Sequence, residues 1–166
     1  MLIVFGGLPG TGKTTLARAL AAELRAAYVR IDAIETAMAR AHVPEDAIVT
    51  GAAYVVGQAV AEGSLAAGAT VVIDAVNAIE LVRRPWRDLA ERLDVPLRVI
   101  EVTCSNEVEH RRRVEQRTAD LDHDLPTWAD VVAREYEPWT EERLVVDTVE
   151  PQVGCLARIK AYVVLS

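Results

Sequence analysis

One short stretch near the start of the chain constrains the fold more than any other. Residues 7–14 read GLPGTGKT and match the pattern G-x-x-x-x-G-K-[ST] at every fixed position. The apolar run Leu2–Phe5 precedes them and a helical pattern follows, which is the strand–loop–helix context that this motif requires. Glycines in such a loop let backbone N–H groups turn inward around a phosphate chain, and the helix adds the positive end of its dipole. The stretch therefore predicts a nucleoside triphosphate site.

The residues of this loop have distinct expected roles. Lys13 is expected to reach the β- and γ-phosphates as a point charge, and the Thr14 hydroxyl to take a place on Mg²⁺. Composition favours a phosphate cradle over a plain turn, because lysine occurs only at positions 13 and 160 and arginine serves elsewhere as the cation. The predicted cofactors are ATP and Mg²⁺. The expected nucleotide contacts are Gly7, Leu8, Pro9, Gly10, Thr11, Gly12, Lys13, Thr14 and Thr15.

Strand and helix patterns alternate along the rest of the chain. Apolar and β-branched runs indicate four further strands, at 28–31, 70–74, 96–102 and 144–148. This alternation predicts βαβ units and a parallel sheet. We therefore expect an α/β P-loop NTPase fold, with three αβα layers and a five-stranded parallel sheet. One domain would span 1–166 and carry a helical lid at about 105–126.

Asp32 directly follows the strand predicted at 28–31. It belongs at the carboxyl edge of the sheet, where open α/β folds bind their ligands. It is therefore a candidate to accept the proton of a substrate hydroxyl or to orient that hydroxyl. The alternative is an N-cap for a helix at 33–41. Arg30 and Glu35 are weaker candidates for the same pocket.

Asp74 ends the buried strand predicted at 70–74 and is a candidate ligand of Mg²⁺, directly or through water. The next residue, Ala75, stands where a dedicated ATP-hydrolysing protein would usually carry a second carboxylate. Its absence favours transfer to an acceptor over hydrolysis. Asn77 either offers its amide to a substrate or holds its own loop.

The densest charge in the chain lies at 107–117, after Ser105 as a possible helix cap. Arg113 and Arg117 are four residues apart and so share a helix face. In a phosphotransferase, such arginines can close over the triphosphate and neutralise the phosphoryl group in transfer. The alternative is a solvated helix with Glu–Arg pairs.

The remaining segments predict structure more than chemistry. Residues 43–50 are expected to form a surface loop. A helix at 83–93, with Pro85 near its start, should present a solvated basic face and bury Trp86. Thr127 is expected to cap a helix that runs to about 137.

Several classes of function are excluded or disfavoured. The formal net charge of −7 argues against nucleic acid as the main partner without excluding it. Cys104 and Cys155 lack metal or disulfide spacing and are expected to be reduced thiols. The three histidines also lack metal-ligand spacing, and no segment reaches membrane-spanning length. The N-terminal apolar run is too short for a signal peptide, so a cytoplasmic protein is expected.

The chain resembles the small P-loop kinases of the family often labelled AAA-type. This family includes the kinase domain of phage polynucleotide kinase, with chloramphenicol phosphotransferase, zeta toxins and gluconate kinase as more distant relatives. The resemblance covers 7–15, 30–32, 72–77, 109–117 and 128–148. It implies that Asp32 serves as base and that Arg113 and Arg117 belong to the lid.

These observations predict a phosphotransferase that uses ATP and moves the γ-phosphate to a hydroxyl of a small-molecule acceptor. Three alternatives stay open: a polynucleotide 5′-hydroxyl kinase, a toxin-like kinase of nucleotide sugars, and an ATP-binding regulatory module that transfers nothing. The sequence names neither the acceptor nor the oligomeric state.

Overall fold

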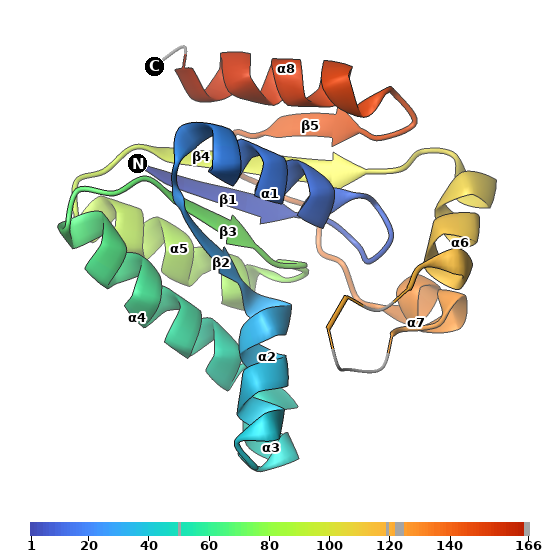
Figure 1. Ribbon diagram of the computed structural model, residues 1–166, viewed down its shortest axis with the longest axis horizontal. Coiled ribbons are helices and arrows are strands. Elements are labelled where there is room, and N and C mark those ends of the chain that lie inside the picture. Colours follow the sequence, from blue (N-terminus) through green and yellow to red (C-terminus); the bar gives the residue numbers. More distant parts are fainter. Residues whose placement is uncertain (50, 119, 122–124, 165–166) are drawn as a thin grey trace.

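The computed structural model describes residues 1–49, 51–118, 120–121 and 125–164. Five parallel strands form one sheet in the order β2-β3-β1-β4-β5 (Figure 1). The strands are β1 (Leu2–Gly6), β2 (Ala27–Arg30), β3 (Val71–Asp74), β4 (Leu97–Thr103) and β5 (Leu144–Asp147). The helices are α1 (Lys13–Leu24), α2 (Ile31–Arg40), α3 (Glu45–Val49), α4 (Ala52–Ala66), α5 (Glu80–Arg92), α6 (Glu107–Gln116), α7 (Trp128–Ala133) and α8 (Gln152–Val164). The predicted α/β fold with a five-stranded parallel sheet is confirmed.

Helices cover both faces of the sheet. α1 and α8 pack on one face, and α4 and α5 pack on the other (Figure 1). Strand β1 is buried on both faces. Leu2 and Val4 face the α4–α5 side, whereas Ile3 and Phe5 face the α1–α8 side. A parallel strand that is buried on both faces has no exposed side for polar residues. In the described part of the chain, no helix combines the length and apolarity needed to cross a membrane.

The candidate functional residues meet at one edge of this sheet. Because the strands are parallel, their carboxyl ends all lie on the same side. The strand register places Phe5 and Arg30 on either side of Asp74. The loop after β1, the start of α2 and the end of β3 are thereby brought together.

Two segments differ from the sequence prediction near this edge. Residues 45–49, expected in a loop, form the short helix α3. Helix α2 begins at Ile31, immediately after β2, with Arg30 at its N-cap position. Asp32 therefore lies inside the first helical turn, which excludes the alternative of an Asp32 N-cap. The consequence is that its carboxylate is not used to cap a helix.

Three helix boundaries also differ. Helix α5 begins earlier than predicted, so Pro85 lies inside it. Helix α6 is capped by Asn106 rather than Ser105, because the Asn106 side chain accepts a hydrogen bond from a backbone N–H one turn later. Thr127 caps α7 as predicted, within a capping box, but the helix ends at Ala133.

Candidate active site

The loop between β1 and α1 presents a row of free backbone donors. Gly10 and Gly12 have left-handed φ values of 84° and 86°, which a residue with a Cβ would resist. Among the described residues, no acceptor pairs with the backbone N–H groups of Gly10, Gly12, Lys13 or Thr14. These groups surround the start of α1, where the helix dipole also favours an anion. The loop can therefore cradle a phosphate chain.

Lys13 and Asp74 form a buried ion pair at the base of this cradle. The Lys13 Nζ atom lies 2.8 Å from Asp74 Oδ1, and the Tyr28 hydroxyl donates to Asp74 Oδ2 at 2.6 Å. The Thr14 side chain lies near enough to this carboxylate to help lower its pKa. Burial alone would raise the pKa of Asp74, but the charge of Lys13 and these hydrogen bonds outweigh burial and hold the pKa below its usual value.

Thr14 and Asp74 together form an oxygen donor set suited to Mg²⁺. No group of three or more His, Cys, Asp or Glu side chains in the described part of the chain could hold a metal ion. Magnesium needs fewer protein ligands than that, because it usually keeps several waters and binds substrate phosphates. The two side chains therefore fit an ion that arrives with a nucleotide.

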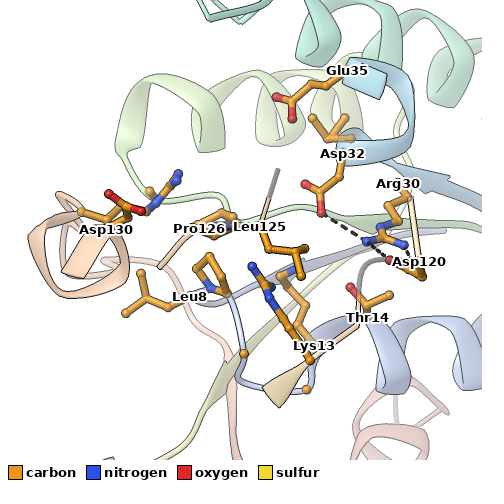
Figure 2. A pocket seen from close by; sticks show the side chains of 18 of the residues that line it. Leu8, Lys13, Thr14, Arg30, Asp32, Glu35, Asp120, Leu125, Pro126 and Asp130 are labelled. Carbon is orange, nitrogen blue, oxygen red and sulfur yellow. Dashed lines mark hydrogen bonds and ion pairs between the residues drawn. The ribbon is translucent and has the colours of Figure 1, made fainter. Parts of the chain in front are cut away.

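A cavity of about 1380 Å³ opens beside the cradle. Figure 2 shows Asp32 and Glu35 on one side of it, and Lys13 and Thr14 on the other. Glu35 has no hydrogen-bond or ion-pair partner among the described residues, and burial together with the charge of Asp32 raises its pKa. One cavity thus joins the phosphate cradle to the carboxylates of Asp32 and Glu35.

Arg30 links Asp32 to the segment after α6. Its guanidinium contacts both oxygens of Asp120, at 2.6 and 3.1 Å, and Asp32 Oδ2 at 3.4 Å (Figure 2). Arg18 adds a further contact to Asp120 at 3.1 Å. The hydrogen bond from Arg30 is the main cause that lowers the pKa of Asp120 to about 2. Both carboxylates are therefore held by one arginine.

The two predicted lid arginines have different surroundings. Arg113 donates to Glu109 and to both the hydroxyl and the carbonyl of Thr148, and it lines both this cavity and a smaller one of about 490 Å³. The smaller cavity is formed by Gly12, Thr15, Leu16, Arg113 and residues 148–152. Arg117 lines the larger cavity, and its Nε and Nη2 atoms are buried without a partner among the described residues. Burial lowers the pKa of Arg117. An anion in the cavity would supply the partner that these buried donors lack.

Asn77 and Arg83 do not belong to the site. The Asn77 amide donates to the Phe5 carbonyl at 2.7 Å, and its oxygen accepts from Trp86 Nε1 at 3.2 Å. Both ends of the amide are therefore occupied, and of the two predictions for Asn77 the loop-holding one is confirmed. Arg83 was expected on a solvated face, but it is only 2% exposed. That prediction was wrong, because its side chain folds inward onto backbone carbonyls.

Sequence reasoning missed two residues around the cradle. Tyr28 was interpreted only as part of a strand, although its hydroxyl holds Asp74. His110 was considered only as a metal ligand, although its ring contacts the Pro9 carbonyl. The available signal for Tyr28 was a tyrosine in the strand next to that of Asp74. No local pattern pointed to the role of His110, because its partner Pro9 is 101 residues away.

The glycine-rich cradle, the buried aspartate that ends β3 and the parallel sheet define a P-loop nucleotide-binding protein. The sequence model described as the AAA domain matches residues 2–138. The chain belongs to that family. Comparison with curated protein sequences found no match.

Solved structures share this fold over nearly the whole chain. A Chloroflexus aurantiacus protein provisionally assigned as a kinase is 23% identical, with a TM-score of 0.76 and coverage of 98% of this chain and 94% of that one. A sugar kinase from Janibacter sp. HTCC2649 is 20% identical, with a TM-score of 0.71 and coverage of 98% and 93%. The APS kinase CysC of Mycobacterium tuberculosis, in complex with AMPPNP and APS, is 16% identical, with a TM-score of 0.69 and coverage of 98% and 96%. The fold is that of small P-loop kinases.

Proposed function

We propose that this protein is an ATP-dependent kinase that transfers the γ-phosphate to a hydroxyl of a small-molecule acceptor. The observation that carries the proposal is that Asp32 lines the same cavity as the phosphate cradle. A carboxylate there can accept the proton of an attacking hydroxyl or orient that hydroxyl. The likeness to a sugar kinase and an APS kinase supports a small acceptor.

The proposed roles follow from the geometry of the cradle. The free N–H groups and Lys13 would bind the phosphate chain, with Lys13 leaving Asp74 to do so. Thr14 and Asp74 would hold Mg²⁺, which would supply positive charge to the phosphates. Arg113 and Arg117 would stabilise the negative charge on the transferring phosphoryl group.

The adenine would lie in the smaller cavity. This cavity adjoins Gly12 of the cradle and the polar end of β5, where Thr148 and Arg113 line it. The larger cavity would then remain for the γ-phosphate and the acceptor. Donor and acceptor would approach each other from opposite sides of the cradle.

The test is ADP release from ATP and Mg²⁺ with a panel of acceptors: sugars, nucleosides, aminoglycosides and 5′-hydroxyl oligonucleotides. We expect one small-molecule class to stimulate turnover, and Asp32→Asn to lower that turnover about 100-fold or more. Asp88→Asn is the matched control, because Asp88 lies in an exposed pair with Arg84 on α5, outside both cavities. Stimulation by oligonucleotides alone would favour a polynucleotide kinase. Turnover that no acceptor changes and that Asp32→Asn leaves intact would favour a regulatory module.

A further inference from the structure

Two polar contacts tie carbonyl groups of the phosphate loop to other parts of the fold. The His110 Nε2 atom of α6 lies 2.8 Å from the Pro9 carbonyl oxygen. The Thr148 hydroxyl, just after β5, lies 2.7 Å from the Thr11 carbonyl oxygen. Because a carbonyl can only accept, His110 carries its proton on Nε2 and both side chains act as donors.

Packing holds the His110 donor in place. The imidazole is 7% exposed, and its ring meets Trp128 edge to face, with centroids 5.1 Å apart and an interplanar angle of 82°. A Cβ added at Gly10 would lie 2.5 Å from Val114 Cγ2 and 3.2 Å from His110. The loop therefore lies directly against α6, and the helix leaves no space for a side chain at this position.

Arg113 connects the second donor to the same helix. Its guanidinium donates to the Thr148 hydroxyl at 2.8 Å and to the Thr148 carbonyl at 3.0 Å. The hydroxyl thus accepts from Arg113, and its single proton goes to the nearer of two carbonyls, that of Thr11 at 2.7 Å and not that of Thr103 at 3.1 Å. Helix α6 consequently acts on the loop at two points, once directly and once through Thr148.

The planarity of the peptide bond gives these contacts a consequence for ligand binding. The carbonyl of one residue and the N–H of the next point in opposite directions. A donor that fixes the Pro9 carbonyl therefore also fixes the Gly10 N–H, and one that fixes the Thr11 carbonyl fixes the Gly12 N–H. Neither His110 nor Thr148 lines the larger cavity, whereas Gly10 and Gly12 both do. The two free N–H groups are thereby directed toward the cavity.

We propose that His110 and Thr148 are positioning residues that hold the loop in its phosphate-binding conformation. The inference rests on the proposed nucleotide site and adds to it the part of the fold that prepares that site. Donors that are already aligned need no reordering when the ligand binds. The gain in affinity comes from contacts to the phosphate chain and not from contacts to the base. It should therefore grow with the number of phosphates in the cradle.

The experiment compares the affinities of MgADP and AMP, measured by displacement of a fluorescent ADP analogue. His110→Phe keeps the ring and removes the donor, and Thr148→Val keeps the shape and removes the hydroxyl. We expect His110→Phe, which lies outside both cavities, to weaken ADP binding about 5- to 10-fold and AMP binding less than about twofold, as for loss of one hydrogen bond. Thr148 also lines the smaller cavity, so Thr148→Val is judged by the ratio of the two affinities and should weaken ADP binding about fivefold more than AMP binding. His110→Gln, which retains an N–H donor, should recover most of the ADP affinity. Ser64→Ala is the matched control, because it removes a hydroxyl-to-carbonyl hydrogen bond on α4.

Urea unfolding without nucleotide separates this role from a purely structural one. A wild-type ratio of AMP to ADP affinity in both variants, even with lowered stability, would overturn the inference and leave the nucleotide site standing. If His110→Phe does not fold, Thr148→Val tests the inference by itself, because loss of its hydrogen bond to Thr11 should also weaken ADP binding more than AMP binding. A wild-type chain that binds neither nucleotide would overturn the proposed site itself, and this inference with it.

Discussion

The guanidinium of Arg83 lies 3.9 Å from the centroid of the Trp139 ring, and both side chains are buried. Four backbone carbonyls surround the same guanidinium at 2.7 to 3.1 Å: those of Asn77, Ala78, Glu137 and Pro138. No carboxylate is ion-paired with Arg83 in the described part of the chain. Arg83 therefore uses its donors to join the segment after β3 to the segment after α7.

We expect Arg83→Leu to lower the free energy of unfolding by about 3 kcal/mol, because it leaves buried carbonyls without donors. Urea unfolding measures the loss. Arg84→Leu is the control, since the Arg84 side chain is 72% exposed on the same helix. A loss equal to that of the control would show that water replaces the lost donors.

Lys13→Met is expected to destabilise the protein by about 3–5 kcal/mol at pH 7, because it leaves Asp74 buried and unpaired. In the wild type, the lowered pKa of Asp74 gives stability that is full above the unfolded pKa and is lost as the pH falls through the folded pKa. In the variant, burial without Lys13 raises this pKa, so protonation restores stability as the pH falls. The difference between the two proteins should therefore shrink from pH 7 to pH 5.

Urea unfolding at both pH values measures this difference. Lys160→Met is the control, because Lys160 pairs with Glu23 on the surface and should change stability by less than about 1 kcal/mol. A difference that stays constant or widens toward pH 5 would contradict the assigned role of the Lys13–Asp74 pair.

Asp120→Asn tests the link between Arg30 and the segment after α6. Without this carboxylate, Arg30 is free to pair fully with Asp32 and to draw it away from an acceptor hydroxyl. We expect KM for the acceptor to rise about fivefold and KM for ATP to change less than twofold. Stability should change by about 1 kcal/mol or less, because Asp120 is 49% exposed. Steady-state kinetics with the acceptor identified in the panel test this prediction, with Asp88→Asn measured in parallel as the control. Equal changes in both KM values would contradict the proposed role of Asp120.

Arg117→Met is expected to lower kcat about 100-fold, with MgADP affinity changed by less than about threefold, because the charge acts on the transferring phosphoryl group. Stability should stay equal or rise, since the variant removes a cation whose Nε and Nη2 atoms are buried without a partner and whose pKa burial lowers. Single-turnover kinetics test the expected loss of kcat, and urea unfolding tests the expected stability. Arg111→Met, in an exposed pair with Glu115, is the control. A large loss of stability with unchanged kcat would make Arg117 structural.

The local features of the site were predictable from sequence. The phosphate loop depends on glycine conformations and on the start of a helix, which are properties of neighbouring residues. The position of Asp74 followed from a buried strand that ends in a carboxylate, since parallel strands share one binding edge. Asp32 was placed at the right edge, although its exact position in α2 was not foreseen, because the strand passes into the helix without a loop.

The contacts that shape the site were decided by tertiary structure. Tyr28 reaches Asp74 across 46 residues, Asn77 reaches Phe5 across 72, and His110 reaches Pro9 across 101. Such partners meet only after the strand order and the helix packing bring their backbones together. The sequence by itself determined a P-loop, its lysine and the carboxylates at the sheet edge, because short-range conformation encodes them. The folded chain decided which polar side chains face the cavity and which hold the loops, because each buried donor must find an acceptor wherever packing places one.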